Sequence, residues 1–276
     1  MSAFKLKKDS SGIATLTFDL EGEKINKLSA VVLAELDSTL DKLAADKDIK
    51  LLVIDSAKPG VFIAGADIEE IRGLTVEKEA VEKVKKGQDV LNKLEKLPYP
   101  TVALINGACM GGGTELALAC TYRITTDNKK CQMALPEVNL GIFPGFGGTQ
   151  RMPKLVGIVQ GLTLITSGKS VDGKKAEKIG LADTCIPEGY MNTQLPEFLN
   201  SIVSGKYKRK SAEGIYDKFS PLRQLVYSKT KKEVLKAYPN DTKLVFKNFP
   251  LAFHAGAKPA ARAALAAGKQ GKFWEM

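Results

Sequence analysis

The sequence predicts an α/β protein, because strand-like and helix-like segments alternate along its first two hundred residues. Apolar and polar residues alternate over 13–18, as in a half-buried strand, and the apolar run 51–54 is typical of a buried strand. Between these segments, apolar residues recur at helical spacing from 32 to 43, behind Ser29, a residue type that caps helices. Strands that alternate with helices indicate an α/β domain.

The alternation continues toward the middle of the chain. Pro98 and Pro100 separate a long amphipathic pattern from the next apolar run, and a glycine triplet at 111–113 precedes a small apolar segment. We expect helices over about 76–96, 115–120, 150–166 and 173–180, and strands over 101–105, 122–125 and directly after 180–183.

A different composition begins near Ser204. Lys206–Lys210 holds four basic residues in five, a pattern typical of a linker or a solvated surface. Beyond it we expect a basic helix over about 221–237, a strand over 243–246 and an alanine-rich helix over 259–267. The predicted organisation is an α/β domain over 1–205 and a basic, mainly helical region over 206–276.

The charge of the chain is uneven. The formal net charge is +10, yet residues 201–276 carry 16 basic and 5 acidic side chains, whereas residues 1–200 carry 25 and 26. A basic total often indicates a nucleic-acid partner, but the tail has neither a recognised module nor interleaved aromatic residues. Nucleic-acid binding through the basic end is therefore the least favoured of the alternatives.

The rare residues exclude several classes of site. His254 is the one histidine, which argues against a histidine-based triad or a multi-histidine metal site. The four cysteines contain no C-x-x-C pair, so we expect reduced thiols in a cytoplasmic protein. The first residues lack the apolar core of a targeting signal, and no apolar run reaches the roughly 18 residues of a membrane span.

Three segments rich in small residues could carry chemistry: 62–68, 106–115 and 135–149. Glycine allows close approach of the backbone to a ligand, and N–H groups at the start of a helix favour negative charge. Asp67 and Glu70 have the spacing of a capping box. Each segment alone could also be a tight turn, and neither a P-loop nor a dinucleotide fingerprint is present.

Together, in this order and spacing, the three segments resemble the crotonase (enoyl-CoA hydratase/isomerase) superfamily over about residues 4–190. The amino-acid sequence over 23–29, 135–138 and 144–151 is most similar to that of the hydratase domain of multifunctional fatty-acid β-oxidation α-subunits. The resemblance implies a crotonase-like spiral of β-β-α units followed by a helical C-terminal region. It also implies hydration of trans-2-enoyl-CoA to 3-hydroxyacyl-CoA.

The resemblance assigns roles residue by residue. The backbone N–H groups of Ala66 and Gly112 would form an oxyanion hole for the thioester oxygen. Glu115 would chiefly activate water and Glu137 would chiefly deliver a proton to Cα, with opposite protonation states. The backbone of Gly145 would help to hold the water.

Contacts with coenzyme A and with partners are implied in the same way. The substrate would be an acyl-CoA, without a resident cofactor or metal, and assembly would be a trimer-based homo-oligomer or a complex with other β-oxidation enzymes. The CoA-contacting backbone would lie near Lys24, Ile25, Ala64, Asp67 and Ile68.

The end of the chain resembles a different family. Residues 235–250, His254 and residues 260–274 resemble one strand and one helix of a DsbA-like thioredoxin-fold protein, without its C-x-x-C motif. The tail is then either a fused fragment or a chance likeness of an amphipathic helix. Two further readings stay open: Δ3-Δ2-enoyl-CoA isomerisation, and a catalytically impaired acyl-CoA-binding or interaction protein.

Overall fold

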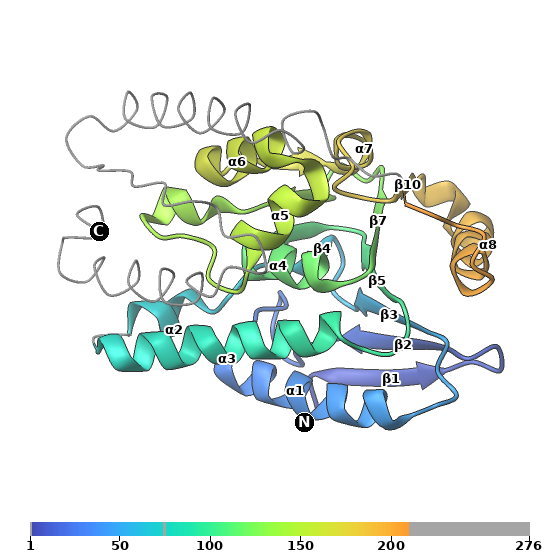
Figure 1. Cartoon of the computed structure of the whole chain (residues 1–276), viewed down its shortest axis with the longest axis horizontal. Coiled ribbons are helices and arrows are strands. Elements are labelled where there is room, and N and C mark those ends of the chain that lie inside the picture. The colour runs from blue at the N-terminus through green and yellow to red at the C-terminus, as the bar shows by residue number, and fades with distance from the viewer. Residues whose placement is uncertain (1, 74–75, 210–276) are drawn as a thin grey trace.

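A six-stranded sheet forms the frame of the protein. The computed structural model describes residues 2–73 and 76–209 (Figure 1). In this sheet β1 and β2 are antiparallel, and every other neighbouring pair is parallel. In order across the sheet, its strands are β1 (Phe4–Lys8), β2 (Ile13–Phe18), β3 (Leu51–Ser56), β5 (Thr101–Ile105), β7 (Tyr122–Thr126) and β10 (Thr184–Ile186).

A smaller, four-stranded sheet holds the second strand of each repeat. β4, β6 and β8 are parallel neighbours, and β9 pairs antiparallel with β8. Its strands are β4 (Val61–Ile63), β6 (Ala108–Met110), β8 (Gln132–Ala134) and β9 (Val171–Asp172). The chain passes three times from the larger sheet to the smaller sheet and then into a helix, which is the β-β-α spiral that the resemblance implies.

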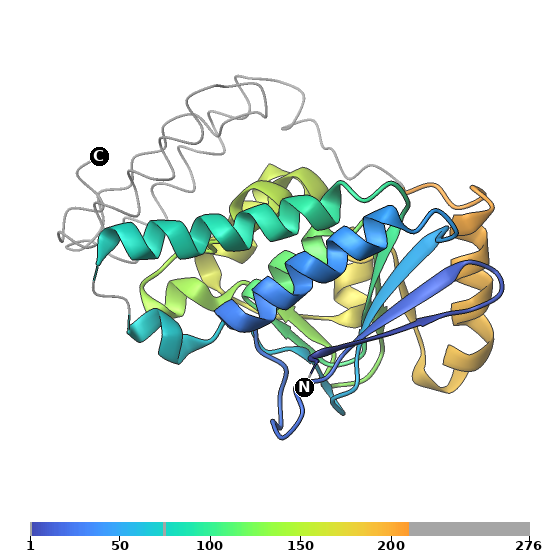
Figure 2. The same cartoon turned by 90° about the horizontal axis from the view of Figure 1, so that it is seen from below.

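Helices cover both faces of the larger sheet. In Figure 2, α1 and α3 lie side by side on one side of the strands and α8 lies on the other. The helices are α1 (Ala30–Ala45), α2 (Ile68–Arg72), α3 (Glu77–Glu95), α4 (Gly112–Ala119), α5 (Gly148–Val156), α6 (Ile158–Ser167), α7 (Gly173–Lys178) and α8 (Met191–Val203), with two 3-10 helices, η1 (Pro136–Leu140) and η2 (Glu188–Tyr190).

Two predicted elements show how the sequence produces this arrangement. Leu52 and Ile54 of β3 face the main core, whereas Leu51 and Val53 face the cluster under α8. A strand with both faces covered is apolar throughout, as predicted for this run. In α1, the Ser29 hydroxyl accepts the third N–H of its helix, and the residues at helical spacing are buried.

Two local predictions need correction. The helical stretch expected over 150–166 is interrupted at Gly157, whose φ of 81° separates α5 from α6. The capping box is incomplete: Asp67 caps α2 by accepting the Glu69 N–H, but the Glu70 carboxylate accepts the N–H of Ala30 instead (3.1 and 3.2 Å). Glu70 thus ties the start of α2 to the start of α1.

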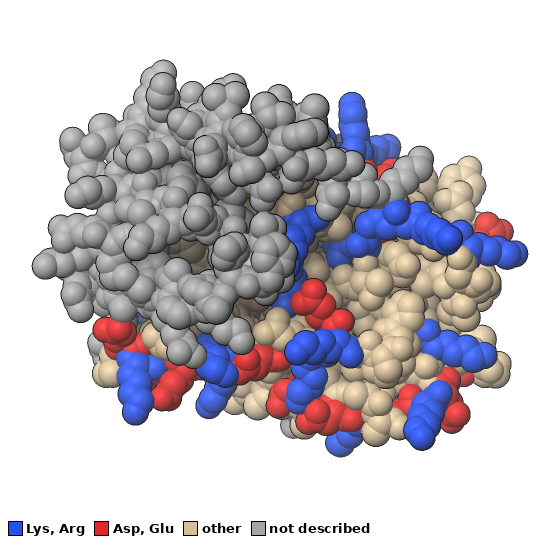
Figure 3. All heavy atoms as spheres, in the orientation of Figure 1, with Lys and Arg blue, Asp and Glu red and all other residues tan. Residues whose placement is uncertain are grey.

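The described chain beyond residue 205 packs on the domain. The Tyr207 hydroxyl donates to Asp183 (3.1 Å), and Arg209 forms an ion pair with the same carboxylate (2.7 Å). The helices and the strand expected beyond residue 209, and the thioredoxin-like likeness, lie outside the described residues. On the face in Figure 3, basic and acidic side chains are interspersed along the lower edge, where α1 and α3 lie.

Candidate active site

Three neighbouring strands of the smaller sheet end at the same edge, and each is followed by one group of the predicted site. Ala66 follows β4, Gly112 follows β6 and Glu137 follows β8. Because the strands are parallel, their carboxyl ends meet at one edge, with neighbours about 4.8 Å apart. The fold therefore brings together groups from three distant stretches of sequence.

Two backbone N–H groups are available at this edge. Gly112 is the first residue of α4, where an N–H has no acceptor within its own helix. Ala66 forms an isolated β-bridge with Leu28, and the hydrogen bonds of that bridge leave the Ala66 N–H unused. A Cβ atom on Gly112 would lie 3.4 Å from the Ala66 nitrogen. Two such donors beside a helix N-terminus can bind an oxygen that carries negative charge.

Glu115 lies in the first turn of α4 and is 2% exposed. Its Oε1 atom accepts hydrogen bonds from the N–H groups of Phe146 (2.8 Å) and Gly148 (2.7 Å). Burial, followed by the charge of Glu137, raises the pKa of Glu115 to about 8, although these donors and Arg151 oppose the shift. The carboxyl group is therefore both buried and fixed in orientation.

Glu137 lies in η1, which Pro136 begins and Gly141 ends. Burial raises the pKa of Glu137 to about 7, and its Oε2 atom has no hydrogen-bond partner among the described residues. Gly111 makes room for this carboxyl group: it has φ 50° and ψ −120°, and a Cβ atom there would lie 3.1 Å from Glu137 Oε1. The unpartnered oxygen can exchange a proton with a bound molecule.

The charge of Glu137 acts on Glu115, so the two carboxyl groups titrate as a pair. Interacting carboxyls lose their protons in two steps that belong to the pair, and between those steps the pair holds one proton. The two N–H donors on Glu115 favour the charged form of that carboxyl, whereas Glu137 Oε2 has no donor to stabilise a charge. These hydrogen bonds favour Glu115 as the base and Glu137 as the acid, whereas the deeper burial of Glu115 raises its pKa above that of Glu137 and favours the opposite order. We assign the roles from the hydrogen bonds, because they act on one identified oxygen of each carboxyl group.

Gly145 lies in the turn before α5, directly next to Phe146. Its carbonyl accepts a hydrogen bond from Gln88 Nε2 at 2.8 Å, a contact that sequence patterns did not indicate. The structure therefore places Gly145 beside Glu115. Its role in holding water stays a prediction.

The residues predicted to contact coenzyme A come from two segments that lie side by side. The Ala64 N–H donates to the Asn26 carbonyl at 2.8 Å, and Lys27 pairs with Asp67 at 3.0 Å. Asn26 is fully buried, and its amide donates to the Phe18 carbonyl, which fixes the first segment against β2. Lys24, Ile25 and Ile68 are exposed along this junction, and Ala64 and Asp67 are partly buried.

Sequence reasoning missed Asn26, although a lone asparagine inside the quoted segment 23–29 was the available signal. It is the only polar side chain among the described residues of that segment that is fully buried. We expect its contacts to hold the backbone around Lys24 and Ile25 in place.

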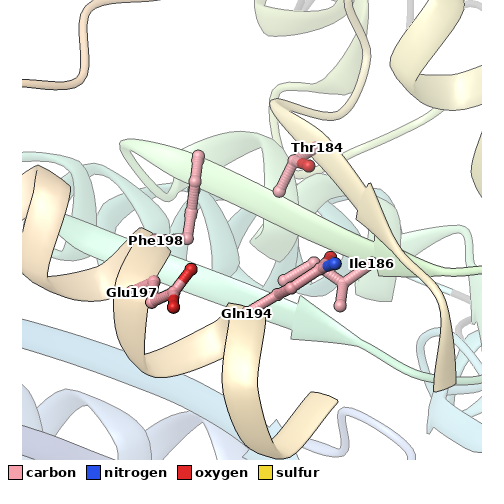
Figure 4. A pocket seen from close by; sticks show the side chains of 5 residues that line it. All are labelled: Thr184, Ile186, Gln194, Glu197 and Phe198. Atoms are coloured by element: carbon pink, nitrogen blue, oxygen red, sulfur yellow. The ribbon is translucent and has the colours of Figure 1, made fainter. Parts of the chain in front are cut away.

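A separate pocket of about 290 Å³ lies between β10 and α8 (Figure 4). Because α8 covers the face of the larger sheet opposite α4, this pocket is remote from Glu115. It is lined by Thr184, Ile186, Gln194, Glu197 and Phe198.

The sequence model of the enoyl-CoA hydratase/isomerase family matches residues 8–253. The chain belongs to this family. Membership confirms the resemblance inferred from the three segments rich in small residues.

Two relatives in this hydratase/isomerase family are larger proteins. The fatty acid oxidation complex subunit alpha of Vibrio parahaemolyticus is 40% identical over 232 residues, 84% of this chain and 33% of that protein. Its counterpart in Vibrio campbellii is 47% identical over 186 residues, 67% of this chain and 26% of that protein. The chain spans about a third of the length of these relatives or less.

Solved structures support the hydratase/isomerase fold. DspI of Pseudomonas aeruginosa matches with a TM-score of 0.66 and 28% identity over 87% of this chain and 93% of that chain. An enoyl-CoA hydratase from Bacillus anthracis matches with a TM-score of 0.65 and 24% identity over 86% of this chain and 96% of that chain. The crotonase-like fold class predicted from the sequence is confirmed.

Across residues 2–73 and 76–209, none of the helices is both long enough and apolar enough to cross a membrane. In the same part of the chain, no three His, Cys, Asp or Glu side chains gather in a group that could hold a metal ion.

Proposed function

We propose that the chain is an enoyl-CoA hydratase, which adds water to trans-2-enoyl-CoA to give 3-hydroxyacyl-CoA in fatty-acid β-oxidation. The observation that carries the proposal is the meeting of two buried carboxyl groups, Glu115 and Glu137, with the N–H group of Gly112 at the start of α4 and that of Ala66 beside it. Syn hydration needs a base, an acid and donors for an enolate oxygen, and these groups supply all three.

The proposed reaction balances protons within the pair. Glu115 removes a proton from water while the water oxygen bonds to Cβ. The electron pair of the double bond moves to the thioester oxygen, where the N–H groups of Ala66 and Gly112 stabilise the enolate, each by about 3 kcal/mol. Glu137 gives its proton to Cα as the enolate collapses. Transfer of the proton from Glu115 to Glu137, direct or through water, restores the starting state.

The proposed contacts with substrate lie on the turn before α5 and on the two segments, 24–27 and 64–68, that lie side by side. We propose that the Gly145 backbone helps to hold the attacking water and that the chain needs no resident cofactor or metal. The backbone near Lys24, Ile25, Ala64, Asp67 and Ile68 would bind the coenzyme A part of the substrate.

Assembly and compartment belong to the same proposal. The curated relatives are named as subunits of a fatty acid oxidation complex, which supports action beside other β-oxidation enzymes. The alternative is a trimer-based homo-oligomer. Light scattering of the purified chain separates a trimer from a monomer that needs a partner. We also propose the cytoplasm as the compartment.

Loss of the enoyl-thioester absorbance of crotonyl-CoA and decenoyl-CoA tests the activity. Glu115→Gln and Glu137→Gln should each lower kcat/KM by about 10²- to 10⁴-fold, because each removes one proton-transfer group. Glutamine at 115 keeps an oxygen for the Phe146 N–H, so the variant should still fold. Full activity in both variants would refute the assignment. Acyl-CoA binding without turnover in the unmodified chain would favour the impaired binding protein instead.

One observation favours Δ3-Δ2 isomerisation as a second activity. Isomerisation moves a single proton between two carbons, and Glu137 Oε2 is an unpartnered carboxyl oxygen in the described structure. Glu115→Gln should therefore retain isomerisation of a 3-enoyl-CoA while it loses hydration. Equal loss of both activities would refute a separate isomerase role for Glu137.

A further inference from the structure

One face of α3 holds the turn that binds Glu115. Gln88 donates to the Gly145 carbonyl (2.8 Å), and Asn92 and Glu95 both bind Arg151 (2.7 and 2.9 Å). The spacing of 88, 92 and 95 places these three side chains on one helix face. The same face of α3 therefore contacts the turn before α5 and the first turns of α5 itself.

The Gln88 contact reaches Glu115 through a single peptide group. The Gly145 carbonyl and the Phe146 N–H belong to the same peptide bond. Gln88 donates to its oxygen, and its N–H donates to Glu115 Oε1 at 2.8 Å. Hydrogen bonds in such a chain polarise one another, so the first bond strengthens the second and fixes the plane of the peptide.

The second donor to Glu115 is held differently. The Gly148 N–H shares its peptide with the Gly147 carbonyl, which accepts the first backbone bonds of α5 from residues 150 and 151. That donor is thus oriented by the helix itself. The Phe146 donor is instead held by side chains: Gln88 binds the carbonyl of its own peptide (2.8 Å), and Arg151 Nη1 donates to the Phe146 carbonyl in the next peptide (2.9 Å).

Close packing between α3 and the turn supports this dependence. A Cβ atom on Gly87 would lie 2.3 Å from a ring atom of Phe146. Glycine inside a helix costs about 0.5 to 1 kcal/mol relative to alanine, and here it lets the Phe146 ring lie directly against the helix backbone. Gly87 sets the position of the turn, and Gln88 sets the orientation of its peptide.

We propose that Gln88 is a positioning residue for Glu115, acting through the peptide between Gly145 and Phe146. The inference rests on the proposed hydratase function for its catalytic consequence, but the contact itself does not require turnover. The other charged groups that act on Glu115 are Glu137 from η1 and Arg151 from α5, and Arg151 is paired with Glu95.

Gln88→Met tests the proposal, because methionine has a similar length and no donor. Loss of the donor weakens the Phe146 hydrogen bond to the charged form of Glu115, so the titration of Glu115 should move up by about 0.1 to 0.7 pH units. Gln88→Glu should move it further, since a carboxylate cannot donate and adds a like charge. Gln194→Met, the same change in the remote pocket, is the matched control and should have no effect.

Two readouts separate this inference from the proposed function. Amide resonances of Phe146 and Gly148, recorded against pH by NMR on selectively ¹⁵N-labelled chain, report the ionisation of Glu115 without substrate. Crotonyl-CoA hydration reports the same shift in the pH profile of kcat/KM, with KM little changed. An inactive unmodified chain refutes the hydratase, and the amide titration still decides the role of Gln88. A folded Gln88→Met chain with an unshifted Phe146 midpoint, whatever its Tm, refutes the positioning role.

Discussion

Asp183, directly before β10, pairs with two guanidinium groups, and its replacement by asparagine gives a quantitative test. Its carboxylate is 1% exposed and lies 2.7 and 2.8 Å from the Arg209 nitrogens and 3.4 Å from Arg123 Nη2. It also accepts the backbone N–H of Arg123 (2.8 Å) and the hydroxyl of Tyr207 (3.1 Å). Burial raises the pKa of Tyr207 to about 12, so its hydroxyl stays a donor.

Asp183→Asn removes the only negative charge that these described contacts provide for Arg123, which is itself 1% exposed. Removal of one partner from a buried ion pair costs about 3 to 5 kcal/mol. The Arg123 guanidinium keeps three backbone carbonyls at 2.8 to 3.0 Å, which places the expected loss of folding free energy near the lower value, about 3 kcal/mol. For a chain of this size, Tm should fall by about 6 to 12 °C.

Urea unfolding followed by circular dichroism measures this loss at constant m-value. Asp89→Asn is the matched control, because Asp89 pairs with Lys85 on the exposed face of α3 and should cost less than about 0.5 kcal/mol. The loss of folding free energy for Arg209→Ala should lie between the losses for these two variants. A loss below about 1 kcal/mol for Asp183→Asn would refute the argument that Asp183 compensates Arg123. If the three variants lose folding free energy in this order, the part of the chain that unfolds cooperatively includes residue 209, which lies beyond the predicted boundary at 205.

Three further predictions concern the carboxyl pair. The kcat/KM of hydration should be bell-shaped in pH with a maximum between about 7 and 8, where the pair holds one proton. Glu115 binds more proton in the folded chain than in the unfolded chain between pH 4.5 and about 8, so its contribution to stability falls as pH rises through this range, and Glu115→Gln should raise Tm at pH 9. Gly111→Ala should displace the Glu137 carboxyl and cost about 1 to 3 kcal/mol in a denaturation assay. Gly189→Ala, where a Cβ atom meets nothing within 4 Å, is the control, and equal effects at 111 and 189 would contradict the close approach.

Local sequence patterns predicted the helices and strands in which buried apolar residues recur at a regular spacing. α1 shows its helical stripe and its cap in sequence, and β3 shows the apolar run of a strand covered on both faces. The smaller sheet was not predicted, because strands of two or three residues carry no period and are stabilised by partners far along the chain. α8 was missed as well, and Pro196 inside it argues against a helix by propensity alone.

In the candidate site, too, one part was predictable from the sequence and another part was not. The resemblance indicated Glu115, Glu137, Ala66 and Gly112, and the fold brings these positions together. Their hydrogen-bond environment was not predictable, since Gln88 lies 57 positions from the carbonyl that it binds. No local pattern encodes a contact between a helix face and a turn at that separation.

The parallel ladder β4-β6-β8 has a consequence for how such a site can vary. Each strand is followed by one group of the site at the same edge, and neighbouring strands lie about 4.8 Å apart. Insertions or deletions in the segments that join one turn of the spiral to the next can therefore reshape what surrounds an acyl chain while Ala66, Gly112 and Glu137 keep their places at this edge. Glu115 differs, because it lies in α4 and is held by the turn before α5. Changes in α3 or in that turn would act on Glu115 without moving the other three groups.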